Sequence, residues 1–216
     1  MQTMRAILSE AWKALNIHSG WIIWNLFLAF IPLALSVWLF RRQSRSRSPL
    51  WWLCFIIFAA FLPNAPYLLT DIIHLIQATR AGFSAWIITL VLIPQHLFAI
   101  LAGFEAYVIS LINLGYYLHR QGLSRFIIAA ELITHALCAV GVYLGRFLRF
   151  NSWDLVTKPD DVVRSVVYDL IGKRPVVIMI VTFVVLAISY WLMKQVTLAI
   201  LFRIRYKDSD NATENF

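Results

Sequence analysis

Residues 63–75 read Pro-Asn-Ala-Pro-Tyr-Leu-Leu-Thr-Asp-Ile-Ile-His-Leu, so two prolines enclose an asparagine shortly before two ionisable side chains. A proline inside a helix removes a backbone hydrogen-bond donor and clashes with the preceding turn. In a membrane, the backbone groups freed in this way persist only where protein or a water-filled cavity satisfies them. The stretch therefore predicts a broken helix beside a site that contains Asp71 and His74.

The chain around this stretch has the composition of a membrane protein. Of 216 residues, 61% are hydrophobic and 14% are charged, whereas soluble domains are about half apolar and about a quarter charged. The predicted fold is an all-α, polytopic transmembrane helical bundle of about five spans. Cys54 and Cys138 lie in apolar runs without metal-type spacing, which favours buried thiols over a disulfide framework.

Hydropathy divides the chain into an amphipathic interfacial helix over residues 1–19, a transmembrane domain over 20–202 and a polar C-terminal tail over 203–216. We expect spans at residues 21–40, 50–62 with the segment beyond the prolines, 86–118, 126–147 and 176–193. Residues 86–118 favour one span over two, either strongly tilted, kinked at Pro94 or extended beyond the bilayer. A surface helix is expected within 151–175, and disorder over 208–216.

The second span is the unusual one. Its first part, residues 50–62, gives only about 20 Å of helix, which is too short for a hydrocarbon core of about 30 Å. We therefore predict that a second helix, capped by Asn64 and opening near Pro66, completes the crossing.

Basic residues set the expected orientation and the expected partner. The net charge of +8 comes from residues that flank apolar runs, which favours anionic lipid headgroups over nucleic acid. The dense basic loop after the first span predicts a cell-membrane protein with its N-terminus outside and its C-terminus in the cytoplasm. The basic residues of this loop are Arg41, Arg42, Arg45 and Arg47.

An inner polar layer is predicted from the turn near Gly122, because straight antiparallel helices would place Asn113 level with Glu131. His135 would then lie within a turn or two of Glu105. Three interpretations remain open for this layer: a structural hydrogen-bonded cluster, a proton or ion path, and a metal site.

An outer polar layer is predicted because alternating topology puts the ends of the second and fourth spans on one face. Asp71 would form a structural ion pair with Arg146 or Arg149, or these arginines would grip a phosphate. Asp71, His74 and His96 suit a divalent metal by type only, so we expect no metal or other cofactor. The candidate ligand-binding residues are Asn64, Asp71, His74, His96, Arg146, Arg149, Asn151 and Asp154.

Other motifs give packing information but no activity. Gly141 and Gly145 have the small-residue spacing that permits close contact between helices. The sequence contains no nucleophile elbow, phosphate-binding loop or dinucleotide fingerprint, so whether the protein is an enzyme stays open.

Residues 62–75 (LPNAPYLLTDIIHL) and 141–155 (GVYLGRFLRFNSWDL) resemble the signatures of a bacterial family of multi-pass membrane proteins, domain of unknown function 1361. The resemblance extends from about the first span to the last. It implies a bacterial plasma-membrane protein, and it supplies no activity, substrate or catalytic residue.

Three functions are compatible with these patterns. The leading hypothesis is an outward-facing pocket that binds a small polar or phosphate-bearing ligand for transport or sensing. The second is a membrane enzyme that acts on a lipid-linked substrate, with His74 or His96 as the general base. The third is a structural or assembly protein. The sequence leaves the ligand and the oligomeric state open.

Overall fold

The computed structural model of the chain describes residues 2–42, 47–80, 82–168 and 172–213. All regular structure within these residues is helical, which confirms the all-α fold class. Five helical segments of the described chain are long and apolar enough to cross a membrane, as predicted. They are Ser19–Arg41, Pro49–Thr79, Ala85–Arg120, Ser124–Phe147 and Lys173–Ile204.

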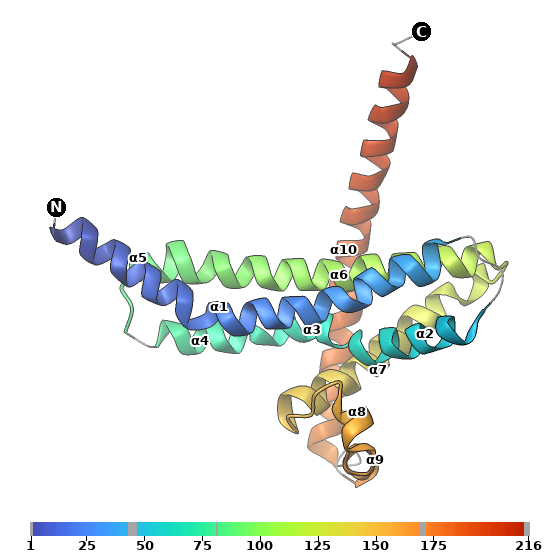
Figure 1. Cartoon of the computed structure of the whole chain (residues 1–216), viewed down its shortest axis with the longest axis horizontal. Coiled ribbons are helices and arrows are strands. Elements are labelled where there is room, and N and C mark those ends of the chain that lie inside the picture. Colours follow the sequence, from blue (N-terminus) through green and yellow to red (C-terminus); the bar gives the residue numbers. More distant parts are fainter. Residues whose placement is uncertain (1, 43–46, 81, 169–171, 214–216) are drawn as a thin grey trace.

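The first helix, α1, runs from Gln2 to Ser36 and is followed by a π-helical turn, η1, at Val37–Arg41. The predicted interfacial helix and the first span are therefore one continuous helix, because no residue near position 19 interrupts the backbone ladder. Figure 1 shows the N-terminal part of α1 bending away from the helices beside it. Within this part, Ala14 is fully buried in a small cluster with Ala78, Ile87 and Leu92. Arg45, in the predicted basic loop, lies outside the described residues.

The second span is broken where the prolines predict. It consists of α2 (Pro49–Phe61), α3 (Asn64–Tyr67), the 3₁₀ turn η2 (Leu68–Asp71) and α4 (Ile72–Thr79). The predicted capping role of Asn64 is wrong. Asn64 is the first residue of α3 itself, the position before it is Pro63 with helical angles (φ −61°, ψ −20°), and no side chain caps this helix.

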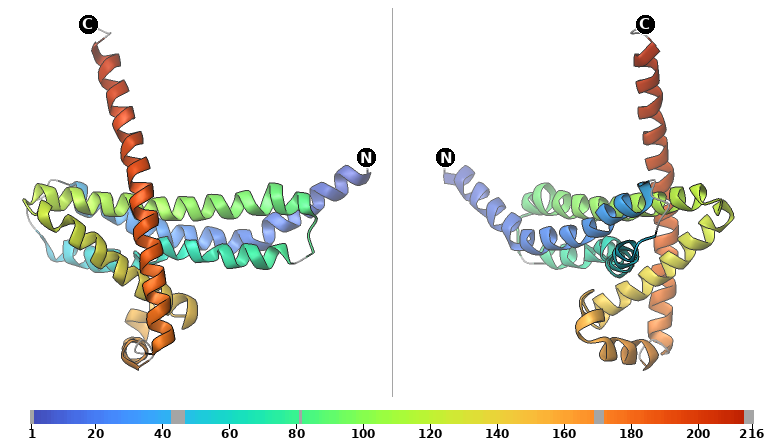
Figure 2. Two further views of the ribbon diagram at one scale, coloured as in Figure 1. Left: turned by 180° about the vertical axis from the view of Figure 1, so that it is seen from behind. Right: turned by 45° about the vertical axis from the view of Figure 1, so that its right-hand side comes forward.

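The third span is single. It comprises α5 (Ala85–Ile87), the π-helical η3 (Ile88–Leu92) and α6 (Ile93–Arg120), and Pro94 lies in the first turn of α6. After a turn containing η4 (Ser124–Phe126), α7 spans Ile127–Phe147. The views in Figures 1 and 2 show α7 diverging from α6 beyond this turn, so the two helices do not lie side by side along their length.

The polar segment after α7 contains α8 (Asp154–Thr157) and α9 (Pro159–Tyr168). α9 lies where we expected a surface helix, within residues 151–175, and its Val162 is buried whereas Val163 is exposed.

The last helix, α10, extends from Lys173 to Thr213. Residues 208–213, which we expected to be disordered, therefore continue the helix. Figures 1 and 2 show α10 crossing the layer of α1, α6 and the second span steeply. Its inward contacts come from its middle part, where Leu186 and Tyr190 are buried.

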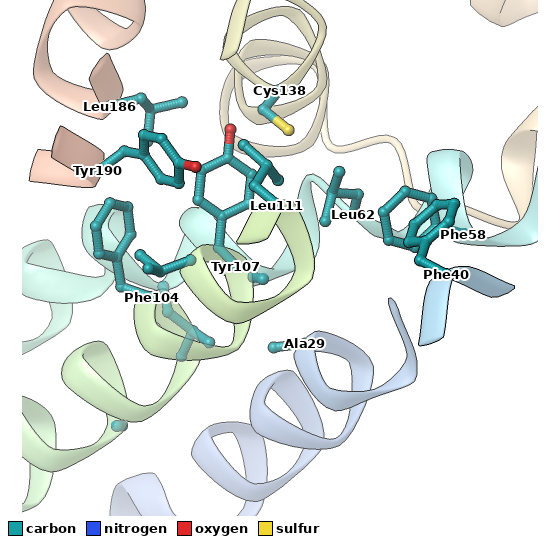
Figure 3. Packing of buried hydrophobic residues seen from close by; sticks show 14 of the residues in the cluster. Ala29, Phe40, Phe58, Leu62, Phe104, Tyr107, Leu111, Cys138, Leu186 and Tyr190 are labelled. Carbon is teal, nitrogen blue, oxygen red and sulfur yellow. The ribbon is translucent and has the colours of Figure 1, made fainter. Parts of the chain in front are cut away.

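The hydrophobic core lies where these helices meet. Figure 3 shows Tyr107 of α6 between Cys138 of α7 and Tyr190 of α10, with Leu62 of the second span close by. Cys138 is a free, buried thiol, as its apolar surroundings predict. This core holds the proline-broken span against α7.

Candidate functional site

Two glycines of α7 accept the broken second span. A Cβ atom built on Gly141 would lie 2.6 Å from Cβ of Pro63, and one on Gly145 would lie 3.2 Å from the Tyr67 ring. Any larger residue at position 141 would therefore push the break away from α7. The small-residue spacing in α7 thus serves packing, against the break itself rather than against a straight helix.

The polar face of the broken span meets the end of α7 at an ion pair. A terminal nitrogen of Arg146 donates to Oδ1 of Asp71 at 2.5 Å. The other carboxylate oxygen, Oδ2, accepts a longer bond of 3.4 Å from the side-chain amide of Asn25 in α1. Asp71 is buried, so three helical segments converge on one shielded carboxylate. Of the two arginines predicted as partners of Asp71, the structure pairs Arg146.

Arg146 has further partners on the same face. Its Nε and a terminal nitrogen donate to Thr70 Oγ1 at 3.0 and 2.6 Å. Its guanidinium also lies 4.4 Å from the centre of the Tyr67 ring, which adds a cation–π contact. With these contacts and Asp71, the guanidinium has few donors left for a ligand.

His74 completes this cluster. Its Nε2 lies 3.3 Å from a terminal nitrogen of Arg146, and its Nδ1 lies 3.3 Å from Oε1 of Gln77. Because a guanidinium only donates, the contact with Arg146 requires Nε2 as the acceptor, and the tautomer with its proton on Nδ1 satisfies both contacts. The ring also packs on Trp21, with ring centres 4.6 Å apart. His74 is therefore held in place by α1 and α7 together.

His96 reaches the same neighbourhood through Trp21 rather than through Arg146. Its ring centre lies 5.9 Å from that of Trp21. Its Nδ1 is bonded to the carbonyl of Leu92 at 2.8 Å. His96 is buried. No group of three or more His, Cys, Asp or Glu residues that could hold a metal occurs in the described part of the chain.

A pocket of about 610 Å³ lies next to this cluster. α1 contributes Trp24, Asn25 and Leu28 to its walls, and the end of α2 contributes Ala59 and Ala60. The break supplies Pro63, Asn64 and Tyr67, and α7 supplies the face from Leu137 to Gly145. The loop from Arg149 to Trp153 and Val162 of α9 complete it. Of the eight predicted ligand-binding residues, Asn64, Arg149 and Asn151 line the pocket.

Arg149 is unusual among the lining residues. It is exposed, and within the described residues its guanidinium has no hydrogen bond or ion pair. Its backbone has φ of 60°, in the left-handed region that non-glycine residues rarely adopt. Phe150 N–H bonds back to the carbonyl of Leu144 at 3.1 Å, which closes the end of α7 and holds Arg149 in this conformation. Among the lining residues described above, Arg149 alone has a charged side chain, and it occupies this strained backbone position.

The loop beyond Arg149 is fixed by short-range bonds. Oδ2 of Asp154 accepts from the backbone N–H of Asn151 at 2.6 Å, which stabilises the turn into α8. The side-chain amide of Asn64 donates to Oγ of Ser152 at 2.8 Å and to the carbonyl of Phe61 at 2.9 Å. Asn64 therefore ties the break to this loop across 88 positions of sequence. Asp154 supports the loop from outside the pocket lining.

Some residues of the site were not predicted. Asn25, Trp21 and Trp24 come from a first span whose inward face is not marked by any polar cluster in the sequence. Thr70 was within reach of prediction, because it directly precedes Asp71 on the polar face.

The predicted inner layer is divided in the structure. Glu131 accepts from Lys194 Nζ at 2.5 Å and from the hydroxyl of Tyr190 at 2.7 Å. Glu105 accepts from Thr197 at 2.7 Å. All three partners belong to α10, so α10 binds both acidic residues of the predicted inner layer.

His135 and Asn113 lie in different parts of this region. His135 Nδ1 is bonded to the hydroxyl of Tyr107 at 2.5 Å, and its ring packs on Tyr190. Asn113 instead accepts from Nε of Arg41 at 2.6 Å and donates to Ser36 at 2.9 Å. Asn113 and Glu131, which we expected at the same depth, therefore bind different partners, because α7 diverges from α6 and the end of the first span lies beside Asn113.

The fold and the site define an all-α, multi-pass membrane protein in which a proline-broken second span packs on the end of the fourth. The chain belongs to the family described as Protein of unknown function (DUF1361), whose model matches residues 24–188. This range contains the broken span, the Asp71–Arg146 pair and the pocket. Comparisons with curated proteins and with solved structures give no significant match.

Proposed function

We propose that the pocket beside Arg149 binds a small polar or phosphate-bearing ligand, for transport across the membrane or for sensing. This proposal rests on the different surroundings of the two arginines at the end of α7. Arg146 is engaged by Asp71, Thr70 and His74, whereas Arg149 lines the pocket and is exposed. Guanidinium groups bind phosphate through paired hydrogen bonds, so Arg149 is the group suited to receive it.

Neutral donors around Arg149 complete a binding face. Asn151 and Ser152 line the same pocket and carry an amide and a hydroxyl group that can donate, whereas both N–H groups of the Asn64 amide are already bonded to Ser152 and Phe61. A phosphate offers several acceptor oxygens, so this set matches it better than it matches a cation. Pockets for small ligands have volumes of roughly 300–1,000 Å³, and a cavity of about 610 Å³ falls within this range.

The Asp71–Arg146 cluster then has a supporting role. A carboxylate that is buried and bonded by Arg146 and Asn25 fixes the broken span against α1 and α7. His74 is bonded to Arg146 and Gln77, and His96 to Leu92. These placements support binding, rather than acid–base chemistry by either histidine, as the role of the pocket.

We place the pocket on the extracytoplasmic side of a plasma membrane, with the N-terminus outside and the C-terminus in the cytoplasm. Support comes from Arg41, Arg42 and Arg47, which follow the first span at the opposite end from Trp24 and Asn25. Basic loops of this kind are retained in the cytoplasm.

The test is a binding titration of the protein, purified in a neutral detergent, with two phosphate monoesters. One probe is the water-soluble glycerol 3-phosphate, and the other is dioctanoyl phosphatidic acid. We expect saturable binding of at least one probe, weakened at least tenfold in Arg149→Gln. The matched control is Arg164→Gln, since Arg164 is an exposed arginine of α9 outside the pocket lining. Binding that is absent for both probes, or equal in wild type and Arg149→Gln, would refute the proposal.

A further inference from the structure

The pocket has two chemically different ends. Its polar groups, Arg149, Asn151, Ser152 and Asn64, belong to the loop after α7 and to the break. Leu137 and Val140 of α7, Ala59 of α2 and Leu28 of α1 line the other part. From Leu137 to Phe147, α7 rises by about 15 Å, so the apolar lining extends well away from the guanidinium.

The apolar end is formed by membrane spans and is open. Leu137 stands at the middle of α7 and is 63% exposed, although it lines the pocket. Ala59 is also exposed. At the depth of a span, the medium outside such side chains is lipid hydrocarbon. A hydrocarbon chain can therefore reach this part of the pocket sideways, without passing through the polar end.

A ligand that is polar throughout would leave the apolar lining unused. An acyl or isoprenoid chain between α2 and α7 would cover it, while the phosphate contacts the guanidinium. Trp24 and Trp153 also line the pocket, and tryptophan favours the boundary between hydrocarbon and headgroups. Charge and lining together match an amphiphile with an anionic head.

We infer that the ligand is a lipid-linked phosphate, whose headgroup lies at Arg149 and whose hydrocarbon tail lies between α2 and α7. This inference rests on the proposed function and specifies the class of ligand for the same pocket. The phosphate chemistry is shared with a water-soluble ester, so the tail is the feature to be tested.

The experiment compares the same two probes in wild type and in two tryptophan variants. Ala59→Trp fills the apolar end, and Ala136→Trp is the matched control, since Ala136 is an exposed alanine of α7 outside the pocket lining. We expect phosphatidic acid to bind at least tenfold more tightly than glycerol 3-phosphate. Ala59→Trp should remove this advantage, while Ala136→Trp should leave it within twofold of wild type.

Failure of this inference is distinguishable from failure of the proposed function. Equal, Arg149-dependent binding of both probes, unaffected by Ala59→Trp, would overturn the lipid-linked ligand and leave the phosphate site intact. Loss of phosphatidic acid binding in both tryptophan variants would also overturn it, since the tail would then depend on the general lipid surface. Dependence on Ala59 but not on Arg149 would reject an anionic headgroup.

Discussion

Two arginines three positions apart have opposite roles in this account, although the sequence presents them alike. Arg146 is the last basic residue within α7, and its side chain faces Thr70 and Asp71. Arg149 follows the end of α7 and itself has left-handed backbone angles. The chain turns at this residue, so its side chain points in a different direction from that of Arg146. The difference comes from the helix terminus and not from the residue type.

Arg149 is expected to trade stability for binding. A left-handed conformation costs a non-glycine residue about 1–2 kcal/mol, and glycine avoids this cost. We therefore expect Arg149→Gly to unfold at a slightly higher temperature than wild type while it loses phosphate binding. Thermal unfolding in detergent, followed by circular dichroism, measures the first effect. A lower unfolding temperature would show that the side chain stabilises the fold, contrary to a binding role.

The Asp71–Arg146 pair is expected to behave in the opposite way. Removing one partner of a buried pair leaves an uncompensated charge and costs about 3–5 kcal/mol. Asp71→Asn and Arg146→Gln should each lower the unfolding temperature strongly, and the double variant should lose less than the sum. The control is Asp161→Asn, since Asp161 is exposed on α9. Additive losses would show that the two side chains do not act as a pair.

At the scale of elements, the break in the second span organises its neighbours. Pro63 and Tyr67 pack on the glycines of α7, and Asn64 reaches the loop beyond it. The prolines and the short apolar run made the break predictable from the sequence. The bond from the Asn64 amide to Ser152 was not predictable, because Ser152 belongs to a loop 88 positions away.

Gly141 tests this contact. A methyl group at position 141 would lie 2.6 Å from a Pro63 ring atom that the backbone holds in place, so relief requires movement of the whole break. We expect Gly141→Ala to lose about 1–3 kcal/mol, as overpacked sites do. In Gly20→Ala the new methyl meets no atom within 4 Å, and alanine's helix propensity should leave that variant at least as stable as wild type. Equal stability of the two variants would contradict close packing at the break.

Across the spans, assigning residues to equal depths in the membrane predicted the contact between the ends of the second and fourth spans. It did not predict the contacts of residues within the spans. Because successive spans cross the membrane in alternating directions, the second and fourth spans were predicted to end on the same face. Asp71 and Arg146 meet there. The expectation that Asn113 lies level with Glu131 assumed straight antiparallel helices. α7 diverges from α6, and α10 supplies Lys194 and Tyr190 to Glu131 instead. Crossing directions depend on side-chain packing, which periodicity in one sequence does not specify.

The proline break and the loop after the fourth span form one site. Asn64 and Ser152 provide the most direct measurement, since their side chains are 2.8 Å apart. In a chain with Cys54→Ser and Cys138→Ala, the pair Asn64→Cys and Ser152→Cys should be joined in membranes by a short thiol-specific cross-linker. Mass spectrometry would then identify the linked peptides. Asn64→Cys with Ser124→Cys, at the opposite end of α7, should give none. Absence of the 64–152 link, or equal linking of the control pair, would contradict the account.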